Sequence, residues 1–258
     1  MTRARRIVQR NAGVYRRIWR GSVFSSFLQP TLYLMALGFG VGSLIDPRRA
    51  AAIAGGASYL QFLAPGLLAG ACMQVASFES AWPVLGKIVW RRNYHAMLAT
   101  PLAIDDLIVG ELLWIGIRLM TVSTAFVLVG VAFGVMRIAP ATLLTVPLAV
   151  LTGLAFSAPI IAYAATLQTG NNFNIVFRFI ITPLFMFSGV FFPVDRLPAP
   201  VQWIAEASPL YHGVQLVRGL TLGQLDPSIA MMHLIYLLAL FVAGFLAARY
   251  TFRRKLYA

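Results

Sequence analysis

Long apolar runs separated by short polar segments set the pattern of this chain. About 20 consecutive apolar residues are enough to cross a bilayer as a helix. The longest uncharged stretch, 138–177, is too long for one span, and the polar cluster 168–174 divides it. The pattern therefore predicts an all-α polytopic membrane protein with six transmembrane helices, at residues 21–45, 59–78, 107–133, 141–167, 175–192 and 229–248.

Composition supports the membrane class and limits the chemistry. Of the 258 residues, 59% are hydrophobic and 11% charged, whereas soluble domains carry about 25% charged residues. The net charge of +13 is concentrated between apolar runs. It does not form the continuous basic face that nucleic acid requires, so we expect no nucleic-acid partner. The single cysteine, Cys72, excludes an intramolecular disulfide.

The distribution of basic residues predicts an orientation. Fourteen Lys and Arg lie in 1–20, 81–104 and 249–258, against five in the loops on the opposite side. Positive residues favour the cytoplasmic side of a membrane. We therefore expect a multi-pass membrane protein with both termini and the 81–106 loop in the cytoplasm.

Residues 1–20 hold seven arginines among apolar side chains that recur at helical spacing. Such a segment is typical of a helix that lies on an anionic leaflet. The alternative is a disordered basic tail. The pattern favours an N-terminal amphipathic interfacial helix.

The segment 81–106 mixes basic and aromatic residues between two apolar runs. One interpretation is a solvated loop. The other is a short amphipathic helix over 84–99, lying on the inner membrane face and presented to a cytosolic partner.

Three charged residues fall within or beside the predicted spans. Glu111 and Arg118 share one face of the third span, and Glu79 ends the second. Two helical turns, about 10 Å, separate Glu111 from Arg118, so a direct ion pair between them would be strained. Charges at this depth face a cavity or another helix. All three are candidates for a transport path or for helix packing.

Residues 193–225 are apolar and interrupted by prolines. Their helical pieces, 201–207 and 211–220, are too short to span a bilayer. We predict two short re-entrant helices between spans five and six, and an ordinary external loop is the alternative.

No catalytic motif is present. The three histidines lack metal-site spacing, and Gly86-Lys87 has neither the upstream glycine nor the Ser/Thr of a phosphate-binding loop. We expect no catalytic residue, cofactor or metal in this chain.

Several blocks resemble one family. They are 33–42, 62–69 with Phe78-Glu79, 94–102 with 110–114, 188–195, 209–213 and Val217-Arg218. Together they resemble the permease subunits of type-2 ABC exporters, and the NodJ branch in particular. The resemblance covers nearly all of 1–258, which implies a single transmembrane domain. It implies a dimeric permease and two copies of a separate ATPase, which would hold ATP and Mg²⁺.

The resemblance also assigns roles to residues. The ATPase would dock on the first cytoplasmic loop, at Lys87, Trp90, Arg91, Arg92, Tyr94, Met97, Thr100 and Pro101. The outer re-entrant pair would include Pro193, Pro209, Tyr211, His212 and Arg218. The implied function is ATP-driven export of an amphipathic substrate, either a lipo-oligosaccharide or a drug-like molecule. A membrane scaffold or assembly factor without transport is the alternative.

The predicted topology can be tested with single cysteines. In a Cys72→Ala background, Asn93→Cys and Ala199→Cys are expected to react with impermeant maleimide from opposite sides of the membrane, because the loops that carry them lie on opposite faces. Labelling of Asn93→Cys from outside intact cells would contradict the orientation.

Overall fold

The computed structural model describes residues 2–41 and 57–256, and within these residues all regular structure is helical. The α-helices are α1 (Thr2–Tyr15), α2 (Trp19–Met35), α5 (Tyr59–Ser80), α6 (Trp82–Leu85), α7 (Asn93–Leu98), α8 (Ile104–Ala132), α9 (Pro140–Ala164), α10 (Asn171–Val176), α11 (Thr182–Phe187), α12 (Ala199–Glu206), α13 (Pro209–Leu222) and α14 (Pro227–Leu256). Three π-helical segments, η1 (Ala36–Val41), η2 (Gly86–Trp90) and η3 (Phe177–Ile181), and one 3₁₀ turn, η4 (Val194–Arg196), complete the description.

Within the described residues, four helices are long and apolar enough to cross a membrane. They are Tyr59–Trp90, Ile104–Ala132, Pro140–Ala164 and Pro227–Leu256. The segment expected as span one is helical as far as it is described, in α2 and η1 up to Val41, and the segment expected as span five is helical up to Phe187, in α10, η3 and α11; neither is among the four. The polar break expected at 46–49 lies outside the described residues.

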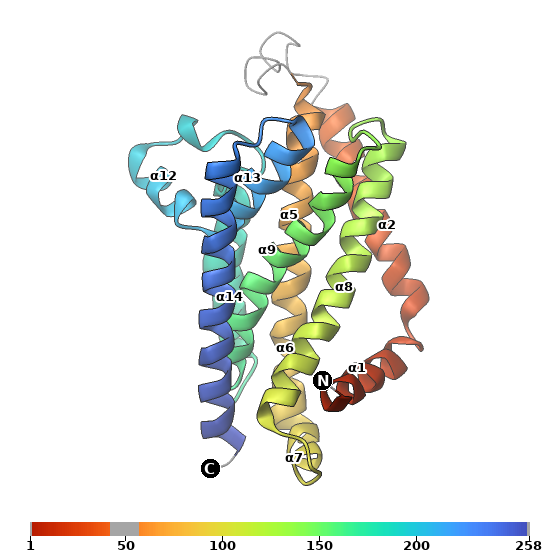
Figure 1. Cartoon of the computed structure of the whole chain (residues 1–258), viewed down its shortest axis with the longest axis vertical. Coiled ribbons are helices and arrows are strands. Elements are labelled where there is room, and N and C mark those ends of the chain that lie inside the picture. Colours follow the sequence, from red (N-terminus) through yellow and green to blue (C-terminus); the bar gives the residue numbers. More distant parts are fainter. Residues whose placement is uncertain (1, 42–56, 257–258) are drawn as a thin grey trace.

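The long helices run along the long axis of the molecule (Figure 1). Both termini and α7 lie at one end of the bundle, and α12 and α13 lie at the other. Helix α5 forms the centre, because most of its side chains are buried, whereas α14 leaves most of its surface exposed.

Small residues let the central helices approach closely. A Cβ atom added to Gly66 would lie 2.9 Å from the carbonyl oxygen of Val190, and one added to Gly70 would collide with the ring of Phe185. Both glycines therefore lie where another segment crosses α5, as small residues do at membrane helix interfaces.

Four predicted boundaries near the first and fifth spans differ from the structure. The N-terminal helix ends at Tyr15, and α2 begins at Trp19, because a short turn reorients the chain between them. The fifth helix begins within the polar cluster, at Asn171, and ends at Phe187. Sequence periodicity reveals neither the turn between α1 and α2 nor the shifted ends of the fifth helix.

The helix expected over 84–99 is interrupted. The chain continues helically beyond α5 as far as Trp90, and Arg92 then adopts a left-handed conformation with φ 46°. A non-glycine residue in this region ends a helix. The short helix α7 follows at an angle, so the segment is neither a solvated loop nor one amphipathic helix.

The close approach at Gly66 gives a stability prediction. Gly66→Ala should lower the free energy of unfolding by about 1–3 kcal/mol, because the added methyl group meets backbone that cannot move aside. The measurement is thermal unfolding of the purified protein in detergent. Gly116→Ala is the matched control, since apart from its chain neighbours and the adjoining backbone of its own helix nothing lies within 4 Å of its added Cβ. Equal effects of the two substitutions would contradict the packing argument.

Candidate functional site

The carboxylate of Glu111 is buried on α8 and is held by two other segments. The Lys87 ammonium, on η2, donates to both of its oxygens at 2.8 and 2.7 Å. The Asn11 amide, on α1, donates to one of them at 3.2 Å. Only 3% of the Glu111 side chain is exposed. A charge at this depth is costly without a partner, so the cluster fixes α1 and η2 against α8.

Arg118, two turns further along α8, makes a second cluster. Its Nε donates to a carboxylate oxygen of Glu79 at 3.3 Å, and its Nη1 donates to the Tyr15 hydroxyl at 2.8 Å. The guanidinium also lies over the Tyr15 ring, whose edge meets Trp114. Glu111 and Arg118 therefore do not pair with each other, and each joins α8 to both α1 and the helix that begins with α5.

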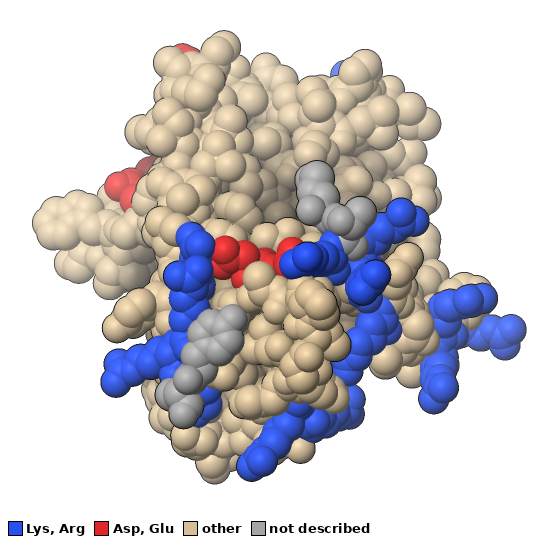
Figure 2. Space-filling model, turned by 60° about the horizontal axis from the view of Figure 1, so that its bottom comes forward, with Lys and Arg blue, Asp and Glu red and all other residues tan. Residues whose placement is uncertain are grey.

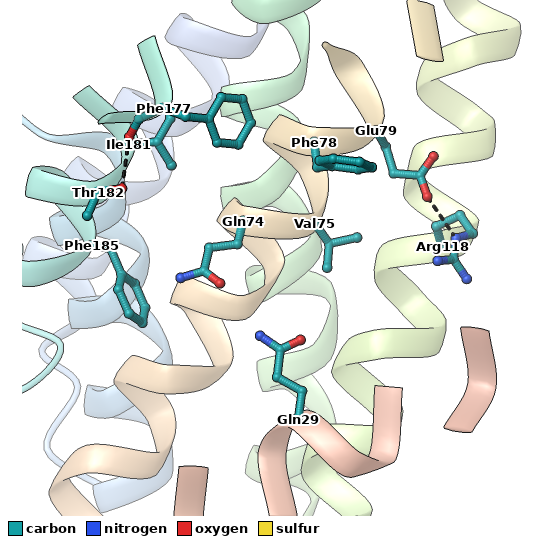
Figure 3. Close-up of a pocket in the computed structure, with 10 residues that line it drawn as sticks. All are labelled: Gln29, Gln74, Val75, Phe78, Glu79, Arg118, Phe177, Ile181, Thr182 and Phe185. Carbon is teal, nitrogen blue, oxygen red and sulfur yellow. Dashed lines mark hydrogen bonds and ion pairs between the residues drawn. The ribbon is translucent and has the colours of Figure 1, made fainter. Parts of the chain in front are cut away.

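A cavity of about 470 Å³ opens between α2, α5 and the fifth helix. Figure 3 shows Gln29 and Gln74 extending into it from α2 and α5, with the Glu79–Arg118 pair at one side. The remaining lining is mostly apolar and aromatic: Val75, Phe78, Phe177, Ile181, Thr182 and Phe185. The cavity can therefore accept an apolar group that carries a few hydrogen-bonding atoms.

A second cavity, of about 350 Å³, lies between α1, α6, η2 and α8. Its lining includes Tyr15, Lys87 and Trp90. Glu79 and Arg118 line both cavities, so this ion pair stands between them.

The end of the bundle that carries both termini is basic. Figure 2 shows Lys and Arg side chains gathered across it. Arg91 and Arg92 are exposed there, and 61% of the Trp90 surface is accessible. Three of the expected coupling residues therefore lie on an open surface.

Tyr94, which we expected to contact a partner, lies inside the protein. Its side chain is fully buried, and its ring packs on Phe252 of α14 with 5.9 Å between centroids. Burial, followed by the charge of Glu111, raises the pKa of the Tyr94 phenol well above its ordinary value. Met97 is partly buried in the same core, whereas Thr100 and Pro101 are exposed.

Of the outer residues named from the sequence, two prolines lie at the starts of helical segments, and the other three are packed side chains. Pro193 precedes η4, and Pro209 opens α13. Tyr211 packs edge-on against His212, whose Nδ1 lies 2.6 Å from Nδ1 of His233. The histidines are far apart in sequence, and the packing of α13 on α14 brings these two together.

Arg218 is also buried, and it donates only to backbone carbonyls among the described residues: those of Phe62, Gly189 and Val190. Asn11, Gln29 and Gln74 were not identified from the sequence. Each is a polar residue within a helical apolar pattern, and that signal could have identified them.

Comparison with known proteins defines the class. Residues 2–222 match the model of the ABC-2 type transporter family, and the chain belongs to this family. It is a multi-pass membrane protein and a transport permease.

The chain is also similar to individual members of this family. The chain is 31% identical over 248 residues to Nodulation protein J of Rhizobium leguminosarum bv. viciae, covering 96% of this chain and 93% of the relative. It is 26% identical over 238 residues to the inner membrane transport permease YadH of Escherichia coli (strain K12), covering 90% of this chain and 86% of the relative.

The buried Lys87–Glu111 pair gives a double-mutant prediction. Lys87→Met should destabilise the protein by about 3–5 kcal/mol, because it leaves a buried carboxylate without its cation. Adding Glu111→Leu should restore most of the unfolding free energy, since no charge is then stranded. The free energies of unfolding of the two single variants and of the double variant are measured by thermal unfolding in detergent. A double variant as unstable as the sum of the single variants would show that the two residues do not interact.

Proposed function

We propose that this chain is the permease subunit of an ATP-driven exporter in the inner membrane. Two copies form the transport unit, and two copies of a separate ABC ATPase dock on the end that carries both termini and α7. Each subunit crosses the membrane six times, with α2 and the α10–α11 helix as the two additional spans. Both termini face the cytoplasm, α1 lies along the inner leaflet, and α12 and α13 re-enter the outer leaflet.

The observation that carries this proposal is the position of the Glu79–Arg118 pair. It separates a cavity at the basic end from a cavity within the bundle. The same pair is joined to α1 through Tyr15. A force applied at the basic end therefore reaches the wall between the cavities through direct contacts.

The contacts that transmit this force begin at the exposed surface near Trp90. Trp90 ends the continuous helical stretch that starts at Tyr59, so movement of this end is carried into α5. Lys87 and Glu111 pass the same movement to α8. We infer that ATPase closure shifts these helices, opens the Glu79–Arg118 pair and admits substrate to the inner cavity.

The lining of the inner cavity indicates the substrate class. The Gln29 and Gln74 amides offer hydrogen bonds, while Phe177, Ile181 and Phe185 offer an apolar surface. An amphipathic molecule satisfies both. The resemblance to the NodJ branch implies a lipo-oligosaccharide, and a drug-like amphiphile has the same two features.

The energy source belongs to the partner. Neither a phosphate-binding loop nor a metal-site spacing occurs in the sequence. ATP and Mg²⁺ are therefore assigned to the ATPase subunits, and this chain contributes no catalytic residue.

The docking surface gives the next prediction. Trp90→Ala should weaken ATPase co-purification and ATP-driven transport at least about tenfold, because exposed aromatic anchors typically contribute 2 kcal/mol or more to an interface. Arg91→Ala and Arg92→Ala should each have smaller effects, as expected of rim charges. Tyr94→Ala should instead lower protein stability, since its ring lies in the core.

Trp203→Ala is the matched control, because Trp203 is 72% exposed at the opposite end of the bundle. The assay is export into inside-out vesicles together with recovery of the ATPase. Unchanged docking and transport in Trp90→Ala would place the ATPase elsewhere. A stable complex whose ATP hydrolysis ignores every amphipathic substrate would favour the scaffold.

A further inference from the structure

A third cavity lies at the end of the bundle opposite the termini. Its volume is about 510 Å³, within the range of small-molecule sites. It is enclosed by the start of α5, η4, α12 and α13, and charged and amide side chains dominate its lining: Asp195, Arg196, Gln202, Glu206, Gln215, Arg218 and Gln224. This polar lining distinguishes it from the inner cavity between α2, α5 and the fifth helix, whose lining is mostly apolar.

Arg218 forms the buried positive part of this cavity. It is 93% buried, and its guanidinium stacks on the Phe62 ring at 3.7 Å. Three hydrogen bonds to backbone carbonyls hold it in place. No carboxylate of the described residues forms an ion pair with it. Carbonyl groups orient the guanidinium but do not neutralise its charge.

A negative group also lines this cavity. Glu206 ends α12 and is exposed, and it forms no ion pair within residues 2–41 and 57–256. Asp195 and Arg196 pair with each other at 3.7 Å, at a rim where both are more than 70% exposed. The cavity thus offers one positive and one negative group that no partner in the described part of the chain neutralises.

The exposed side chains of helix α12 indicate at which level of the bilayer this cavity lies. Trp203 and Ile204 are 72% and 66% exposed, while Ala205 is buried and Gln202 faces inward to the carbonyls of Asp195 and Leu197. An exposed tryptophan beside an exposed isoleucine is typical of a helix at the headgroup level of a bilayer.

We propose that this cavity binds the headgroup of a zwitterionic phospholipid that carries a primary ammonium group. The phosphate lies on the Arg218 side and the ammonium on the Glu206 side. The acyl chains leave the cavity along the exposed apolar surface of α12. The ligand is a resident lipid that steadies the re-entrant segment.

The placement in the outer leaflet rests on the proposed orientation of the permease. Lipid binding itself requires neither an ATPase nor transport. Loss of lipid binding and failure of the proposed function are therefore separate results.

The test is native mass spectrometry of the delipidated permease in detergent. The protein is titrated with phosphatidylethanolamine, phosphatidylcholine and phosphatidylglycerol that share the same acyl chains. The wild type should bind phosphatidylethanolamine at least about tenfold more tightly than the other two, because its ammonium both donates hydrogen bonds to the Glu206 carboxylate and neutralises it, whereas choline has no N–H donor and the glycerol headgroup has no cation. Equal affinities for the three lipids would overturn the proposal.

Glu206→Gln is the decisive variant, because it keeps the size of an exposed side chain and removes only its charge. It should erase the preference for phosphatidylethanolamine over phosphatidylglycerol. Arg218→Met should weaken binding of all three lipids about tenfold, although it also removes three buried hydrogen bonds. A preference that persists in Glu206→Gln would overturn the assignment.

Arg137→Met is the matched control, since Arg137 is exposed and does not line the cavity. It should leave all three affinities unchanged. Soluble phosphoethanolamine forms the last arm of the experiment. If it displaces the lipid at equal concentration, the site recognises a soluble ligand and the assignment to a membrane lipid is wrong.

Discussion

The rest of the structure depends on the neutralisation of two charges on one helix. Glu111 and Arg118 point from α8 into a region where an unpaired charge is costly. Each finds its counterion on the helical stretch that begins with α5, and each also receives a contact from α1. Three segments are thereby held in one arrangement. The basic surface, the inner cavity and the wall between the two cavities all derive their positions from these two clusters.

Local physics accounts for much of what could be predicted from the sequence. Runs such as 107–133 and 229–248 are uncharged or nearly so over the length of a span, and both are helices in the structure. The spacing of Glu111 and Arg118 indicated that an ion pair between them would be strained. It could not identify Lys87 and Glu79 as partners, because those contacts join residues 24 and 39 positions apart and depend on how the helices pack.

The surface assigned to the partner shows where sequence reasoning ends. Trp90 and Tyr94 are both aromatic, both near arginines and both within one mixed segment. The left-handed backbone conformation of Arg92 turns the chain between them. Trp90 therefore remains exposed, while Tyr94 enters the core against Phe252. Residue type predicts that an aromatic side chain will find a surface to cover. Only the backbone path decides whether that surface belongs to the same chain.

The π-helical segments have a consequence for variation in chain length. In η2 the amide of Arg91 bonds to the carbonyl of Gly86, so this turn holds one residue more than an α-helical turn. Deleting one residue there closes an ordinary turn and leaves the flanking faces in register. The same deletion in the middle of α8 rotates everything beyond it by about 100°. Deletions of a single residue are therefore tolerable at η1, η2 and η3, whereas the helices between them require a fixed length.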